Sequence, residues 1–349
     1  MKRYRFSILK SAGRVVLALL VAIGVWGLMA CGGGSSNGIG GVKEPTAYVF
    51  NAQTAEKAAF LAVDYLDVFL GFSELTAAIL EVAESGEDSA DFSNLCDGSG
   101  TAFLNAQQPF GQGTSVILTL TDCIDEVVGG TVNFSVGGYN ESAILPSTVV
   151  TMRVDVNLSG GGQTSEGQFF LRVVRNADKS EMGFLYRGFP DREAFWSITE
   201  PAPVGKTTFA CFDFNLVFLG NGDGAAAVLG DRRLVSRTGG GFAATKGLIV
   251  DERNRLFGLT GAFFPVDSEL RFGKEGDEWV PVSGYGLDFY SNAADNKECR
   301  VVGIDEGITP GTTSMTLRVD EEVFGGVILA VDPPDGDPIR TTWLDLLDD

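Results

Sequence analysis

An alternation of apolar and polar residues dominates the chain after residue 96. In residues 150–158, Val150, Met152, Val154, Val156 and Leu158 alternate with polar side chains. A period of two places one face of a strand in a core and the other face in water. The same pattern recurs at residues 116–120, 132–136, 169–173, 182–186, 212–218 and 315–319. Because turn-forming Gly, Asn and Asp separate these stretches, the sequence predicts a mainly β fold: a large antiparallel meander forming a curved sheet, open barrel or sandwich.

The residues before these strands follow a helical pattern. Residues 54–84 lack proline and are rich in Ala, Leu and Glu, and they place an N-terminal helical part at 54–85. Gly71 is expected to interrupt this helix, with Ser73 restarting it. The apolar stripe of the helix consists of Phe60, Val63, Leu66, Phe69, Phe72, Leu75 and Leu80. A stripe this wide favours packing against the sheet over a role as a membrane or partner helix.

The first thirty residues have the layout of a secretory signal peptide. Five basic residues and no acidic residue accompany an apolar stretch at 15–29. This stretch is shorter than the roughly 18 to 20 residues that span a bilayer, so a signal peptide at 1–30 is favoured over an uncleaved membrane helix. The next motif, Leu28, Met29, Ala30 and Cys31, resembles the lipobox of bacterial lipoproteins.

The lipobox resemblance implies a lipid anchor. In such lipoproteins the cysteine, here Cys31, receives a diacylglyceryl group and becomes the N-terminus, and fatty acids such as palmitate supply the acyl chains. Two or three acyl chains hold a protein on a membrane stably. Gly32 follows the cysteine in place of Asp, which in Gram-negative lipoproteins permits transfer to the outer membrane. Residues 31–42 are then the acylated cysteine with a flexible Gly/Ser tether, and 43–349 form the ectodomain, facing either the periplasm or the cell surface.

Charge and the absence of histidine exclude several functions. The chain has 26 basic and 46 acidic residues, and removing the five basic residues of the signal peptide leaves a net charge of −25. A protein this acidic is repelled by nucleic acid and by anionic lipid head groups. The chain contains no histidine. That excludes Ser-His-Asp and Cys-His catalysis and histidine-held zinc, iron and haem, and no cofactor is expected.

Four cysteines besides Cys31 predict disulfides in an oxidising compartment. They are Cys96, Cys123, Cys211 and Cys299. Of the three connectivities, the sequential one is favoured because each pair then lies within one half of the chain. The block from Cys96 to Tyr139 resembles a pattern in uncharacterised Gram-negative envelope lipoproteins, in which Cys, Gly-Thr, a strand, Cys, Gly and a strand follow in order. That resemblance supports the Cys96 to Cys123 bridge and implies no activity.

Acidic residues supply the remaining candidate chemistry. Asp-Gly loops around Asp223, and around Asp335 and Asp337, offer oxygen ligands of the kind calcium accepts. Neither loop fits the EF-hand spacing, and turn formation explains both more simply. Carboxylate clusters suited to glycoside hydrolysis by residue type are Asp122, Asp125 and Glu126, and Glu275, Asp277 and Glu278. The sequence contains no GxSxG motif, and it identifies no catalytic residue.

The sequence therefore predicts a non-catalytic envelope lipoprotein that binds a hydrophobic ligand beside its helix or supports envelope structure. One alternative is an acidic interaction protein for an envelope partner or divalent cations. Another is a carboxylate-dependent glycan hydrolase. A transmembrane barrel is disfavoured because the chain ends in TTWLDLLDD, without an aromatic-ended strand.

Overall fold

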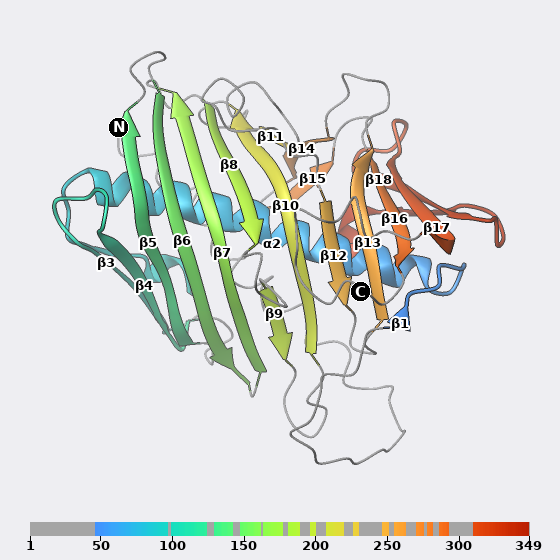
Figure 1. Ribbon diagram of the computed structural model, residues 1–349, viewed down its shortest axis with the longest axis horizontal. Helices are drawn as coiled ribbons and strands as arrows, with labels where there is room; N and C mark the ends of the chain where they lie inside the picture. Colours follow the sequence, from blue (N-terminus) through green and yellow to red (C-terminus); the bar gives the residue numbers. More distant parts are fainter. Residues whose placement is uncertain are drawn as a thin grey trace.

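The computed structural model describes a chain of strands with one long helix (Figure 1). The described residues are 46–96, 99–123, 129–141, 147–161, 163–176, 181–188, 196–199, 207–219, 226–229, 246–250, 255–262, 270–275, 278–281, 286–292 and 310–348. The helices are α2 (Ala55–Glu84), the 3-10 turn η2 (Ser93–Leu95) and α5 (Trp343–Asp348). The strands are β1 (Thr46–Ala47), β2 (Ser89–Asp91), β3 (Thr101–Ala106), β4 (Ser115–Thr121), β5 (Gly129–Glu141), β6 (Ser147–Gly160), β7 (Gln163–Asn176), β8 (Glu181–Gly188), β9 (Trp196–Thr199), β10 (Thr207–Leu219), β11 (Ala226–Leu229), β12 (Lys246–Val250), β13 (Arg255–Ala262), β14 (Leu270–Glu275), β15 (Glu278–Pro281), β16 (Gly286–Asn292), β17 (Pro310–Val319), β18 (Gly326–Asp332) and β19 (Ile339–Thr342).

These strands form one continuous sheet. Strands β2 to β8 make a seven-stranded antiparallel meander, in which each strand pairs with the next. The sheet continues from β8 to β10, then through β12, β13, β16, β17, β18 and β19. A branch runs from β10 through β11 and β14 to β15, and β1 pairs in parallel with β13. The predicted mainly β meander is confirmed, and it takes the form of one curved sheet.

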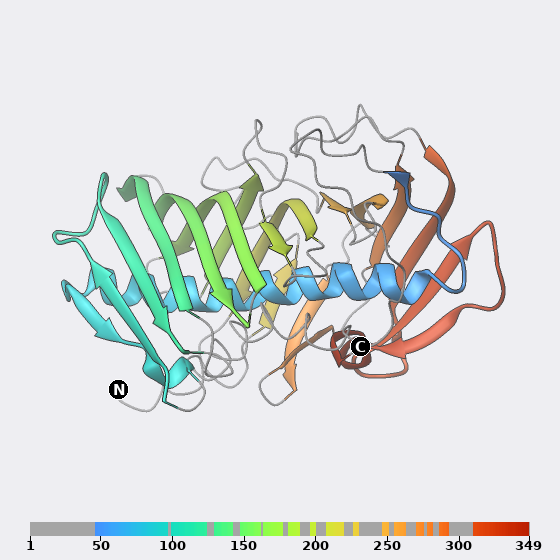
Figure 2. The same ribbon diagram turned by 90° about the horizontal axis from the view of Figure 1, so that it is seen from below.

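The sheet curves around α2 (Figures 1 and 2). Figure 2 shows α2 running the length of the molecule, with α5 beside one of its ends. At about 1.5 Å per residue, the 30 residues of α2 span about 45 Å. The helix contacts α5, β18 and β2. The curve of the sheet therefore gives it an inner face toward α2 and an outer face toward solvent.

Alternating burial along the strands confirms the period-two prediction. In β6 the five predicted apolar residues are buried, whereas Thr151, Arg153 and Asn157 between them are exposed. Along β4, Val116, Leu118 and Leu120 are buried in the same way. Burying one such side chain stabilises a fold by about 1.5 to 3 kcal/mol, so the alternation fixes which face of each strand meets the helix.

Helix α2 is unbroken, so the predicted interruption at Gly71 is wrong. The helix runs from Ala55 to Glu84 without a gap, and all seven residues of its predicted apolar stripe are buried. Ser73 does not cap a new helix, because its hydroxyl donates to the carbonyl oxygen of Phe69 at 2.8 Å, one turn earlier. Glycine costs a helix interior about 1 kcal/mol relative to alanine, and burial of the surrounding side chains outweighs that cost.

The described chain ends in a helix and not in a strand. Helix α5 begins at Trp343, which is fully buried and packs against Phe272 with ring centroids 5.5 Å apart.

Within the described part of the chain, none of the helices combines the length and hydropathy that crossing a bilayer requires.

Candidate functional site

The first predicted disulfide is present. Cys96 follows η2 and Cys123 follows β4, and their sulfur atoms are bonded with a Cα–Cα distance of 4.4 Å. The bridge closes the loop that contains β3 and β4. At Gly100, close to the bridge, a Cβ atom would lie 2.1 Å from the carbonyl oxygen of Asp122, so only glycine fits where the two segments meet.

The side chains of the other predicted site cysteines lie outside the described residues. Cys211 lies in β10, paired in register with Leu248 of β12, but its side chain is outside the described set. Cys299 and the predicted acylation site Cys31 also lie outside the described residues. The bridge between Cys211 and Cys299 and the acylation of Cys31 therefore stay predictions.

Of the predicted acidic ligands, the structure describes those in the loop between β18 and β19. Asp335 and Asp337 are exposed in the loop between β18 and β19, and Asp223 lies outside the described residues. One Asp335 carboxylate oxygen accepts a hydrogen bond at 3.2 Å from the backbone N–H of Ala52, just before α2. Among the described residues there is no group of three His, Cys, Asp or Glu side chains able to hold a metal ion. Asp335 therefore links the β18–β19 loop to the residues just before α2.

The carboxylate clusters considered for hydrolysis are only partly described. Asp122 is exposed at a turn with a φ of 46°, and Asp125 and Glu126 lie outside the described residues. Glu275 and Glu278 are paired in register across β14 and β15, and Asp277 lies outside the described residues. These positions give no carboxyl separation from which a hydrolytic mechanism follows.

Side chains of α2 fill the space inside the curved sheet. Phe72 stacks on Phe134 of β5 with ring centroids 5.7 Å apart, and it meets Phe169 of β7 edge-on at 5.5 Å. Phe69 lies 4.8 Å from Tyr186 of β8. These rings are all at most 1% exposed. The helix and the inner face of β5 to β8 thus share one aromatic core.

A buried polar contact fixes the helix against the sheet. The hydroxyl groups of Ser73 and Tyr186 lie 2.5 Å apart within this aromatic core. Burial raises the pKa of Tyr186 beyond its ordinary range, so the phenol is neutral at any physiological pH. A phenol held neutral in this way positions α2 and offers no proton for acid–base chemistry near pH 7.

Three carboxylates that no sequence pattern singled out are buried on α2. Asp64, Asp67 and Glu74 are 4–6% exposed. Their spacing of three and seven residues places them on one face of the helix, to one side of Ser73. Burial, and then the charge of Asp67, raise the pKa of Asp64 well above 3.8. This acidic face of α2 therefore contains a carboxyl group that is stabilised in its protonated form.

A nearly buried ion pair lies at the end of α2. Arg175 of β7 contacts both carboxylate oxygens of Glu84, the last residue of the helix. The hydroxyl of Tyr139 on β5 donates to the same carboxylate at 3.4 Å. A negative charge at a helix C-terminus is unfavourable in the field of the helix dipole, and the guanidinium of Arg175 compensates for it.

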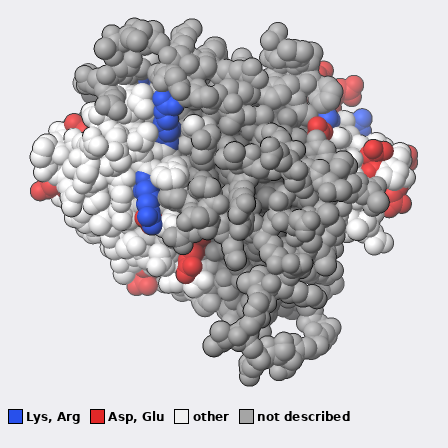
Figure 3. Space-filling view, in the orientation of Figure 1, with Lys and Arg blue, Asp and Glu red and all other residues white. Residues whose placement is uncertain are grey.

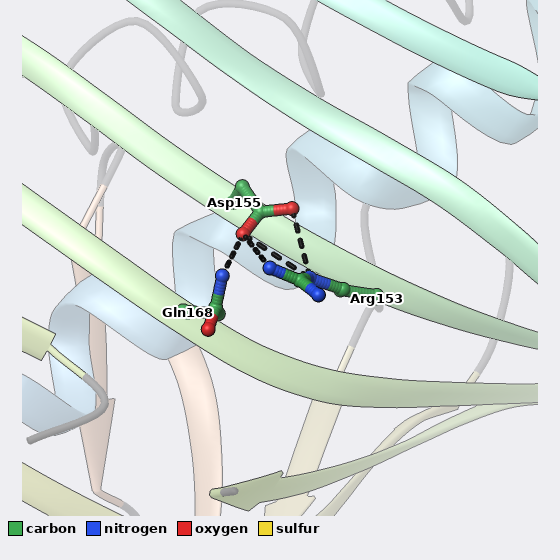
Figure 4. A network of polar contacts seen from close by, with 3 residues as sticks. All are labelled: Arg153, Asp155 and Gln168. Carbon is green, nitrogen blue, oxygen red and sulfur yellow. Dashed lines mark hydrogen bonds and ion pairs between the residues drawn. The ribbon is translucent and has the colours of Figure 1, made fainter. Parts of the chain in front are cut away.

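The outer face of the sheet has a paired charge network of its own (Figure 4). Asp155 of β6 accepts hydrogen bonds from Arg153 of the same strand, at 3.1 Å from both Nε and Nη2, and from the side-chain amide of Gln168 on β7. The side chains of Arg153 and Asp155 are 46% and 35% exposed. An exposed pair of this kind contributes less than about 1 kcal/mol, but it balances charge locally on β6.

A comparison with protein-family models, with curated proteins and with solved structures finds no match to this chain. Three structural features of the described chain therefore bear on its function. They are a filled aromatic interior, an acidic helix face sealed from water and a disulfide-closed end of the sheet, and none of them presents an open constellation of reactive groups.

Proposed function

We propose that the chain is a lipoprotein of a Gram-negative outer membrane, acylated at Cys31, whose β domain supports the envelope without catalysis. The lipobox and signal pattern of residues 1–31 motivate the anchor. Residues 31–42 act as the tether, and residues 43–349 form the part that reaches its partners. The membrane is contacted through acyl chains and not through a helix of the domain.

The filled interior is the observation that carries the supporting role. A ligand carrier needs an enclosed volume of about 300 to 1,000 Å³ for its cargo. In the described part of the core, Phe72 occupies the space between α2 and the sheet and touches both β5 and β7. A packed core that is joined to the helix by the Ser73–Tyr186 contact favours a rigid body over a carrier.

The disulfide is consistent with the proposed compartment. Cys96 and Cys123 are 27 residues apart in the sequence. Closing a loop of this length stabilises a fold by about 3.5 kcal/mol in the chain-entropy model. Structural disulfides persist in oxidising compartments such as the bacterial periplasm and cell surface. The bridge therefore supports an exported protein.

A hydrophobic ligand is the second candidate, because α2 is the helix of the described chain that lies along the inner face of β4 to β8. The buried side chains of these strands, such as Leu118, Val154 and Leu171, are apolar. A lipid would enter that space only if α2 moved away from the sheet. Burial disfavours the charged form of Asp64 on α2, a cost that an apolar residue at this position would not carry, and this favours such movement.

Native mass spectrometry of the full chain, purified from membranes in detergent, separates the two candidates. The supporting role predicts the mass of the acylated polypeptide alone after the detergent is removed in the gas phase. A lipid-sized mass retained in constant proportion across purifications would contradict it and establish the carrier.

A further inference from the structure

The outer face of β3 to β5 lacks charged side chains, although the protein is strongly acidic. The outward residues of these strands are Thr101, Phe103, Asn105, Ser115, Ile117, Thr119, Thr121, Thr131, Asn133, Ser135 and Gly137. Over the whole chain 21% of residues are charged. None of these eleven outward positions carries a charge, and we call them together the uncharged face. Figure 3 shows mainly uncharged atoms at the end of the molecule where these strands lie.

Strand register organises the uncharged face into rows. Ser89 of β2, Asn105 of β3, Ile117 of β4 and Asn133 of β5 are consecutive partners across the sheet. Asp91 of β2, Phe103, Thr119 and Thr131 form the next row, so a carboxylate on β2 borders the uncharged face beside Phe103. Neighbouring strands are about 4.8 Å apart, so the side chains in a row repeat at a spacing close to one sugar residue of an extended glycan chain.

A shallow hollow opens on this face. It has a volume of about 360 Å³ and is lined by residues of β2, β3 and β4 with their flanking turns, namely Asp88, Ser89, Asn105, Ala106, Gln107, Ser115 and Ile117. Asp88 is the one charged residue of the lining. Small-ligand sites have volumes of about 300 to 1,000 Å³, so the hollow is large enough for part of a small ligand.

The side chains of the face suit a neutral, polyhydroxylated ligand. Hydroxyl groups of Ser and Thr and the amides of Asn and Gln both donate and accept hydrogen bonds, as sugar hydroxyl and acetamido groups do. Phe103 is 48% exposed, and its ring offers an apolar surface for the C–H side of a sugar ring. Without charged groups the face provides no attraction for nucleic acid or for an anion.

A protein partner fits the face less well. Protein interfaces are enriched in Tyr, Trp, Phe, Met and Arg and depleted in Ser. Phe103 alone among the eleven outward residues belongs to an enriched type, and most of the others carry a hydroxyl or amide group. The nearest charged network, Arg153 with Asp155, is satisfied within β6 and β7.

We propose that the uncharged face of β3 to β5 binds a neutral glycan chain, with Phe103 as its stacking platform and Asn105 and Thr119 as polar contacts. The identity of that glycan as an envelope component rests on the proposed function, whereas the binding itself does not depend on the anchor. Failure of acylation and failure of glycan binding are therefore separate results.

The test measures binding of the full chain, in detergent, to insoluble cellulose and chitin by co-sedimentation, and to cellotetraose and chitotetraose by calorimetry. The wild-type protein is expected to bind at least one of these neutral glycans saturably, with no binding to the anionic polysaccharide heparin. Phe103→Ala and Thr119→Asp should each weaken that binding about tenfold or more, as loss of an anchor residue does at other interfaces.

Phe324→Ala provides the matched control. Phe324 is 58% exposed, between β17 and β18. The variant should bind glycan as the wild-type protein does, and all three variants should keep the wild-type melting temperature because the substituted side chains are not in the core. Absence of wild-type binding to every neutral glycan would overturn the proposal. Undiminished binding by Phe103→Ala, or an equal loss in Phe324→Ala, would overturn the assigned face.

Discussion

Several side chains of this protein are buried although they carry a polar or ionisable group. Asp64 illustrates the conflict, because it lies in the middle of a buried helix and its neighbour Asp67 is also acidic. The spacing of Asp64, Asp67 and Glu74 on one helix face is visible in the sequence, but their burial is not. A polar face on an amphipathic helix usually meets water, and only the curvature of the sheet around α2 places these groups inside.

Asp64→Asn tests the protonation of this residue. The folded-state pKa of Asp64 is raised above 3.8, the ordinary value that applies in the unfolded chain. Below that pH the carboxyl is protonated in both states, and the protein keeps its full free energy of unfolding. As the pH rises through the raised pKa, part of that free energy is lost because the folded state must ionise a buried carboxyl. Asparagine resembles the protonated carboxyl group and does not titrate. The free energy of unfolding of Asp64→Asn, relative to wild type, should therefore rise with pH by up to about 1.4 kcal/mol per unit.

The measurement is urea unfolding of both proteins at several pH values from about 4 to about 8. A constant difference between the two proteins across that range would show that the pKa of Asp64 is not raised.

Gly130 is a residue whose substitution the backbone does not tolerate. It is the second residue of β5, with a φ of 135°, and a Cβ atom there would lie 2.2 Å from the carbonyl oxygen of Asn157. Gly130→Ala should destabilise the protein by at least about 2 kcal/mol, from strain and from the displaced β6 backbone. Gly137→Ala in the same strand is the control, since its nearest atom is 3.7 Å away. Equal melting temperatures for the two variants would contradict the close approach of β5 and β6.

At the scale of elements, the sequence predicts the strands whose apolar residues follow a local period of two. Alternation identified the strands β4 to β8, β10 and β17, because a half-buried strand needs every second residue to be apolar. The expected break at Gly71 is absent for the opposite reason. Local propensity disfavours glycine in a helix, but the aromatic core around Phe69 and Phe72 is formed by strands far away in the sequence, and it holds the helix continuous.

The docking of α2 on β7 gives a third stability prediction, at the Arg175–Glu84 pair. The two side chains are 10% and 13% exposed, so Arg175→Met leaves a nearly buried carboxylate without its cation. The expected loss is about 3 kcal/mol or more in the free energy of unfolding.

Arg153→Met is the matched control, because Arg153 pairs with Asp155 on the exposed face of β6. It should cost less than about 1 kcal/mol. Chemical denaturation of both variants measures the two losses, and a loss in Arg153→Met as large as that in Arg175→Met would refute the structural role assigned to the buried pair.

At the scale of the whole molecule, a single curved sheet is packed on a helix that runs along its length (Figure 2). The class of fold followed from the sequence, whereas the choice of a curved sheet over an open barrel or a sandwich did not, because register and twist arise from pairings between distant strands. The uncharged face was missed for a related reason. Its members, such as Asn105 of β3 and Asn133 of β5, are ordinary polar residues in sequence and become a surface only when the register aligns them.

Acylation at Cys31 is the central claim of the functional account, since it sets the compartment in which a disulfide-closed, non-catalytic domain would work. The most direct test is mass spectrometry of the N-terminal peptide of the protein extracted from its native membranes. The account predicts a peptide that begins at Cys31 and carries diacylglyceryl and amide-linked acyl groups. A peptide that begins at Met1 and carries no acyl group would contradict it.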